Sequence, residues 1–157
     1  MNYSKALNEC IESSYMVAGH FGARYLESWH LLIAMSNHSY SVAGATLNDY
    51  PYEMDRLEEV ALELTETDYS QDETFTELPF SHRLQVLFDE AEYVASVVHA
   101  KVLGTEHVLY AILHDGNALA TRILERAGFS YEDKKDQVKI AALRRNLEER
   151  AGWTRED

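Results

Sequence analysis

The sequence predicts an all-α protein of two similar halves, each of four helices, joined by an acidic linker. Only two prolines and seven glycines interrupt 157 residues, and Leu, Ala and Glu are abundant, which favours helices with short connections. The apolar pattern also recurs, without gaps, at an offset of 77 residues. Because this period exceeds that of stacking solenoids, we expect a closed pseudo-dimer with an approximate two-fold axis and a binding groove between its halves.

The first helix of each half carries the repeat most clearly. Residues 81–98 place apolar or small side chains at the spacing of an amphipathic helix, at Leu84, Leu87, Phe88, Ala91, Val94, Ala95 and Val98. The matching stripe of the first half is Leu7, Cys10, Ile11, Ser14, Val17, Ala18 and Phe21. Ser4 and Ser81 precede the two stripes and are the expected N-caps of helices over 4–19 and 81–98.

The later helices follow from capping and breaking residues. Ser28 and Thr105 are the expected N-caps of the second helices, and Pro51 suits the first turn of a fourth helix over 51–64. Gly128 is the expected C′ residue of the helix over 117–127. The remaining helices are expected over 41–48, 105–113 and 131–149. The domain thus spans 1–150, with repeat one at 3–64, linker 65–78 and repeat two at 79–149.

Charge and composition narrow the possible partners. The chain has 14 Lys and Arg against 27 Asp and Glu, a net charge of −13, which repels phosphate backbones and anionic lipid heads. This argues against nucleic acid and membrane as partners. A single cysteine, Cys10, forms no intrachain disulfide, and no signal peptide or membrane span is recognisable, so we expect a cytoplasmic protein.

Motifs for catalysis or cofactor binding are missing from the sequence. It contains no G-x-G-x-x-G, no Walker A motif, no G-x-S-x-G and no H-E-x-x-H. The seven histidines lack the i, i+3 or i+4 spacing of a metal site, and no cysteine pair assists them. We therefore predict no catalytic residue, metal or cofactor in this segment. A hydrolase using Glu106 and His107 is a distant alternative, because adjacent helical residues diverge by about 100°.

Two histidines and one carboxylate stand at equivalent helix starts. His30 and His107 each follow an expected N-cap by two residues, which suggests a structural brace in which the ring bonds a backbone carbonyl across the repeat. Glu106 in a first helical turn lies beside backbone N–H groups and can receive a guanidinium or amine. Trp29 occupies the matching place in repeat one. Cys10 falls on the apolar stripe and is expected to be a buried small hydrophobe.

These twin segments resemble a known family. Gly-Thr-Glu-His-Val-Leu at 104–109 and Glu-Ser-Trp-His-Leu-Leu at 27–32 are similar to the Clp N-terminal repeat domain of Hsp100 unfoldases, most closely of the ClpC type. The resemblance implies a module that captures MecA-like adaptors and unfolded or tagged substrates for an ATP-driven ring, which feeds a ClpP-like protease. ATP would bind only in the parent's ATPase modules, and the resemblance implies that residues 151–157 begin a linker towards such a module.

The resemblance also implies a site. In ClpC-type domains the Gly-Thr-Glu-His segment is associated with phosphoarginine recognition, and Trp29 in place of an acid leaves at most one such site, in repeat two. The candidate binding residues are Glu106, Thr105, Gly104, Ser81, Phe80, Trp29, Ser28, Glu27 and Ser4. The alternative is a free-standing acidic regulatory or decoy protein without an ATPase, which the net charge of −13 also suits.

Overall fold

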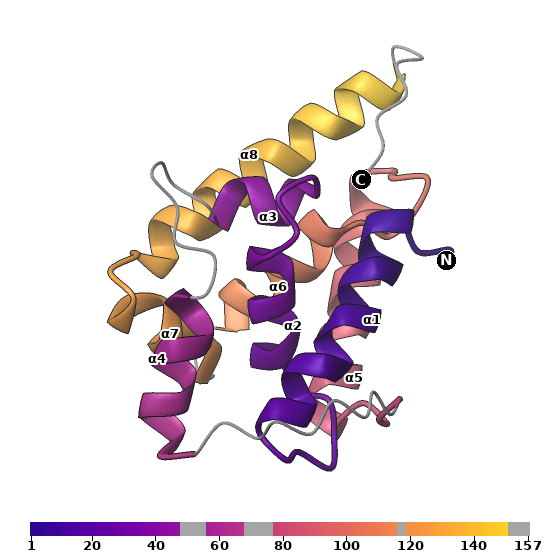
Figure 1. Ribbon diagram of the computed structural model, residues 1–157. Coiled ribbons are helices and arrows are strands. Elements are labelled where there is room, and N and C mark those ends of the chain that lie inside the picture. Colours follow the sequence, from indigo (N-terminus) through magenta and orange to yellow (C-terminus); the bar gives the residue numbers. More distant parts are fainter. Residues whose placement is uncertain (48–55, 68–76, 116–118, 151–157) are drawn as a thin grey trace.

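The computed structural model describes residues 1–47, 56–67, 77–115 and 119–150, and in this part every regular element is a helix (Figure 1). In chain order these are α1 (Lys5–His20), α2 (Ser28–Ser36), α3 (Val42–Leu47), α4 (Arg56–Thr65), α5 (His82–Val97), α6 (Thr105–Asp115), α7 (Leu119–Arg126) and α8 (Tyr131–Arg150). The all-α class with eight helices is confirmed.

The first helices of the two halves are equivalent residue by residue. The bounds of α1 and α5 differ by 77 at both ends, and both serine caps are confirmed. Ser4 Oγ accepts from the Leu7 N–H at 3.1 Å, and Ser81 Oγ accepts from the Leu84 N–H at the same distance. Both caps satisfy one N–H group that the first helical turn leaves without an intrahelical partner.

Four backbone hydrogen bonds establish the pseudo-two-fold relation. The Ser4 N–H donates to the Leu103 carbonyl at 2.8 Å, and the equivalent Ser81 N–H donates to the Leu26 carbonyl at 2.9 Å. In return, Leu103 donates to Asn2 and Leu26 donates to Pro79. Each half therefore gives the other the same contact that it receives, which is the signature of an isologous interface.

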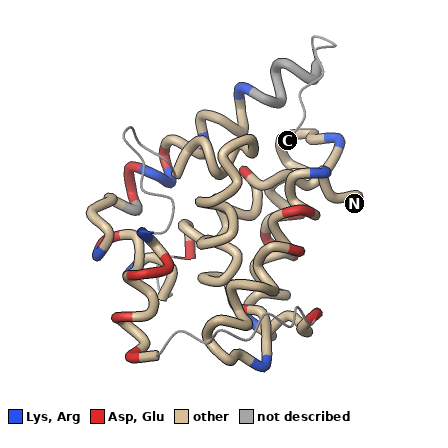
Figure 2. Tube along the Cα trace, viewed as in Figure 1, with Lys and Arg blue, Asp and Glu red and all other residues tan. Residues whose placement is uncertain are grey.

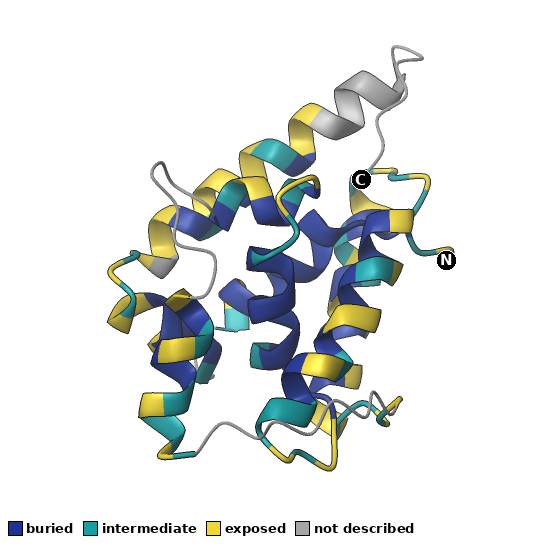
Figure 3. Ribbon diagram, in the orientation of Figure 1, coloured by how far each residue is buried: buried dark blue, intermediate teal, exposed yellow. Residues whose placement is uncertain are grey.

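The helices α2 and α6 form the centre of the molecule (Figure 3). Every residue of α2 except Trp29 is buried, and so is most of α6. The stripes of α1 and α5 pack against them, and Cys10 is fully buried as expected. One continuous core therefore spans both halves, because each pair of helices completes the burial of the other.

The second helices begin one residue earlier than predicted. The N-cap of α2 is Glu27, and Ser28 is its first helical residue, as Thr105 is in α6. The histidine at the third helical position accepts the N–H group of the residue that precedes each helix, as the third residue of a capping box does. Thr105 Oγ1 instead accepts the Ala43 N–H of α3 at 3.1 Å and ties the two halves together.

Of the other predicted helix boundaries, one is confirmed and several lie outside the described residues. Gly128 has φ +98°, which confirms the left-handed residue expected after α7. The predicted start at Pro51, the first residues of the 117–127 helix and most of the 65–78 linker lie outside the described residues. Thr65 is the last residue of α4.

The fourth helices differ most between the halves. The helix α8 packs along α6 and across α3, whereas α4 packs mainly against α7 (Figure 1). Acidic residues Glu58, Glu59 and Glu63 lie on α4, while α8 carries both signs of charge (Figure 2). Within the described residues no helix is long and apolar enough to span a membrane.

Candidate functional site

Each central helix starts with the same histidine brace. His30 Nδ1 accepts the N–H of Glu27 at 2.9 Å, and His107 Nδ1 accepts the N–H of Gly104 at 2.9 Å. For His30 the predicted bond to a carbonyl across the repeat is wrong, because its Nε2 has no hydrogen-bond partner among the described residues. A ring nitrogen that accepts a hydrogen bond satisfies a donor at the helix start, as the acidic residue of a capping box does elsewhere.

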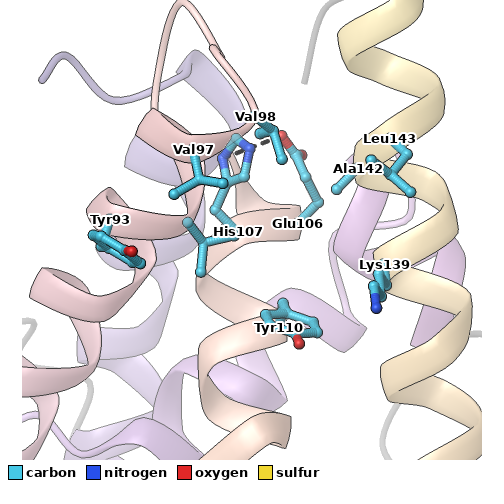
Figure 4. A pocket seen from close by; sticks show the side chains of 10 residues that line it. Tyr93, Val97, Val98, Glu106, His107, Tyr110, Lys139, Ala142 and Leu143 are labelled. Carbon is cyan, nitrogen blue, oxygen red and sulfur yellow. Dashed lines mark ion pairs between the residues drawn. The ribbon is translucent and has the colours of Figure 1, made fainter.

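The Gly-Thr-Glu-His segment lies inside the protein. Gly104, Thr105, Glu106 and His107 are all buried, and the Glu106 side chain is 0% exposed. Glu106 Oε1 lies 3.4 Å from His107 Nδ1 (Figure 4). The carboxylate that we expected at an open helix start is thus held within the fold, and a ligand reaches it only through a pocket.

Such a pocket of about 200 Å³ lies between α5, α6 and α8 (Figure 4). Its lining is almost wholly apolar and consists of Tyr93, Val94, Val97, Val98, Glu106, His107, Tyr110, Lys139, Ala142 and Leu143. Tyr93, Val97 and Leu143 are 71%, 58% and 48% exposed, so the rim of the pocket is apolar too. This arrangement suits an apolar side chain from outside more than a polar ligand.

The pocket adjoins a larger hollow of about 550 Å³ between α5 and α6. The two share Tyr93, Val94 and Tyr110, and the hollow adds the carboxylates Asp89 and Glu90. The apolar lining of the pocket is therefore adjoined by two acidic side chains. Among the described residues no group of three potential ligands could hold a metal ion.

The other candidate residues cap helices, lie inside the fold or pack against neighbouring side chains. Ser4 and Ser81 are helix caps, and Phe80 packs on Phe88 with ring centroids 5.0 Å apart. Ser28 is buried, and Glu27 is half-buried at the start of α2. Trp29 is half-buried and meets Phe21 edge to face, with ring centroids 4.6 Å apart. Of the nine candidates, Glu106 alone lines the described pocket, and a binding role for the others stays a prediction.

Sequence reasoning missed the remaining walls of the pocket. Tyr93 and Val97 fall off the buried stripe of α5, and Leu143 is an exposed apolar residue of α8. Apolar side chains on the solvent face of an amphipathic helix were the available signal. That signal could not show which helix lies opposite, because α5 and α8 meet around α6 only in the folded chain.

Two helical repeats around a pseudo-two-fold axis, with an apolar pocket in one of them, define a duplicated all-α repeat domain. The chain belongs to the Clp repeat (R) N-terminal domain family, whose model matches residues 2–127. The resemblance seen in the sequence is thereby confirmed. A comparison with curated proteins finds no match.

Solved structures share the fold. The N-terminal domain of the caseinolytic protease associated chaperone ClpD from Arabidopsis thaliana aligns with a TM-score of 0.73 at 16% identity, over 89% of this chain and 94% of that one. A chain from preliminary structural investigations of a malarial protein secretion system gives 0.70 at 17% identity, over 94% and 97%. The Hsp104 N-terminal domain from Candida albicans gives 0.66 at 18% identity, over 100% and 96%.

Proposed function

We propose that this chain is the substrate- and adaptor-binding module of an Hsp100-type unfoldase of the ClpC kind. The observation that carries the proposal is the family match over residues 2–127. In this proposal the chain performs no chemistry of its own. It holds a polypeptide in the cytoplasm while the parent's ATPase modules act on it and pass it to a ClpP-like protease.

The pocket of repeat two supplies a place for this contact. Its apolar walls, with the exposed Tyr93, Val97 and Leu143 at its rim, form a surface that water solvates poorly. Unfolded proteins expose apolar segments, and covering both surfaces removes apolar area from water. The −13 charge of the chain limits unspecific contact with anionic partners.

Phosphoarginine recognition is the finer part of the proposal. A guanidinium entering the pocket would meet the Glu106 carboxylate, which supports the role that the resemblance implies. The N–H of Gly104 already donates to His107, so the phosphoryl group would have to use other donors. Free phosphoarginine should therefore compete with substrate in wild type and much less in Glu106→Gln, while phosphoserine competes in neither.

Calorimetry with a MecA-type adaptor and with a permanently unfolded model protein tests the main proposal. We expect at least one of them to bind the chain, and Val97→Ser with Leu143→Ser to weaken that binding. Both substitutions replace exposed side chains, so the fold is retained. Absence of binding to both ligands would refute the proposal.

The net charge of −13 favours a second candidate, a free-standing regulatory or decoy protein. Such a protein would bind the same adaptors but would not be joined to an ATPase. Reading the gene beyond codon 157 separates the two candidates, because only the first predicts AAA+ modules in the same frame.

A further inference from the structure

The wall of the pocket in repeat two has a residue-by-residue counterpart in repeat one. At the offset of 77, Val98 corresponds to Phe21, Glu106 to Trp29 and His107 to His30. The backbone around these positions is equivalent, since α1 and α5 have equivalent bounds and both histidines make the same bond to the residue three positions earlier. The two copies therefore differ there chiefly in side chains.

In repeat one the equivalent space is covered by the chain's own aromatic rings. Trp29 packs edge to face on Phe21, at 4.6 Å between centroids, and its ring centroid lies 3.9 Å from that of His30. Val17, the counterpart of Val94, is only 5% exposed, and Ile33, the counterpart of Tyr110, is 0% exposed. Val94 and Tyr110 are half-buried in repeat two.

The fourth helix does not account for this covering. The helix α8 packs closely on α6, whereas its counterpart α4 makes little contact with α2. Repeat two has Val98 and Glu106 where repeat one has the rings of Phe21 and Trp29, and α8 forms the third side of the pocket of about 200 Å³.

We infer that the pocket of repeat two receives one aromatic side chain of a partner peptide, in the way that repeat one holds the indole of Trp29. The size agrees, because an apolar cavity of about 150 Å³ already accommodates a benzene ring. Basic residues flanking that aromatic residue suit Asp89 and Glu90 in the adjoining hollow. The inference rests on the proposed function, and it assigns one such site to each chain.

Two short peptides test it, acetyl-Lys-Gly-Trp-Gly-Lys-amide and the same peptide with Ala for Trp. Titration followed by amide NMR should show the Trp peptide binding about tenfold more tightly or better, since burial of the ring removes a large apolar area from water. The shifts should centre on Val97, Tyr110 and Leu143. Equal affinities, or shifts confined to other surfaces, overturn the inference.

Variants that exchange the two repeats provide the control. Val98→Phe with Glu106→Trp gives repeat two the residues of repeat one and should reduce binding of the Trp peptide about tenfold or more. If a buried substitution prevents folding, the exposed Val97→Ser variant must still weaken the Trp peptide selectively, and an unchanged affinity contradicts the inference.

The outcome is separable from that of the proposed function. If the adaptor or the unfolded protein binds while the Trp and Ala peptides bind alike, this inference fails and the proposed function stands. If the Trp peptide binds selectively but neither the adaptor nor the unfolded protein does, the pocket assignment holds and the proposed function fails.

Discussion

Repeat one and repeat two share a backbone but not a surface. The caps Ser4 and Ser81, the histidine braces and the reciprocal strand-like bonds are the same in both halves. At the start of the central helix, one half has the ring pair Phe21 and Trp29, and the other has Val98 and Glu106 beside a pocket. The comparison teaches that a duplicated fold tolerates divergence at the start of its central helices, while the interface between the copies stays constrained.

The largest expected effect on stability concerns Gly44 in repeat one, which lies close to two backbone carbonyl groups. A Cβ on Gly44 of α3 would overlap the carbonyl oxygen of His38 and lie 2.8 Å from that of Met35. Gly44→Ala should therefore lower the free energy of unfolding by about 3 kcal/mol, measured by urea denaturation. The counterpart in repeat two is Thr121, which already carries a Cβ. Thr121→Ala should cost only about 1 kcal/mol, and equal losses would contradict the asymmetry.

The second effect is pH dependence from the buried histidine of repeat one. Burial lowers the pKa of His30 from 6.5 to about 3. The unfolded chain therefore takes up the proton first, so this contribution to stability is complete above pH 6.5 and is lost as the pH falls towards 3. At pH 4.5 the loss should be about 2 to 3 kcal/mol.

The variant His30→Gln isolates this contribution. Glutamine at the third helical position can still accept the Glu27 N–H, as in a capping box, but it does not titrate. Denaturation at pH 7.5 and 4.5 should show a smaller stability difference for the variant than for wild type. An undiminished difference would mean that other groups cause the acid sensitivity.

The third effect concerns the bond between the halves. Thr105→Val removes the hydroxyl that accepts the buried Ala43 N–H, and the free energy of unfolding should fall by about 2 kcal/mol. Thr46→Val is the control, because its hydroxyl only donates to the carbonyl of Val42 within α3. A loss below about 0.5 kcal/mol in both variants would show that the cross-repeat bond contributes little.

The smallest effect lies after the first helices. Gly22 follows α1 with φ +63°, and His99 occupies the equivalent place after α5 with φ +57°. Left-handed backbone is costly for a residue with a Cβ, so His99→Gly should raise stability by about 0.5 to 1 kcal/mol. Gly22→Ala should lower stability by about 1 kcal/mol, because alanine disfavours left-handed backbone. The loss is no larger because a Cβ on Gly22 meets nothing within 4 Å. A His99→Gly variant of unchanged melting temperature would argue against strain at this turn.

Local patterns predicted most of the fold. The stripe of α1 is buried from Leu7 to Ala18, as expected from its spacing, and the serine caps stand where predicted. The N-caps of α2 and α6 were placed one residue too late, because Ser28 and Thr105 are favoured cap residues but occupy the first helical position. Propensity alone does not distinguish these two neighbouring positions.

The candidate site was less accessible to sequence reasoning. Glu106 was singled out for the first turn of its helix, but its burial and its place in a pocket depend on α5 and α8, which lie beside it only after folding. Lys134 is another case. Its ammonium group is buried and donates to the Thr46 carbonyl at 2.8 Å, far away in the sequence.

The sequence by itself determined the helical class, the duplication and the family. Apolar periodicity and caps are local patterns, and an ungapped repeat is found by comparing the chain with itself. The tertiary structure decided which copy keeps an open pocket. That outcome depends on the volumes of side chains brought together from three helices, Val98 and Glu106 in one copy and Phe21 and Trp29 in the other, and on the closer packing of α8 against α6. Close-packed interiors turn such small differences in volume into a filled or an empty site.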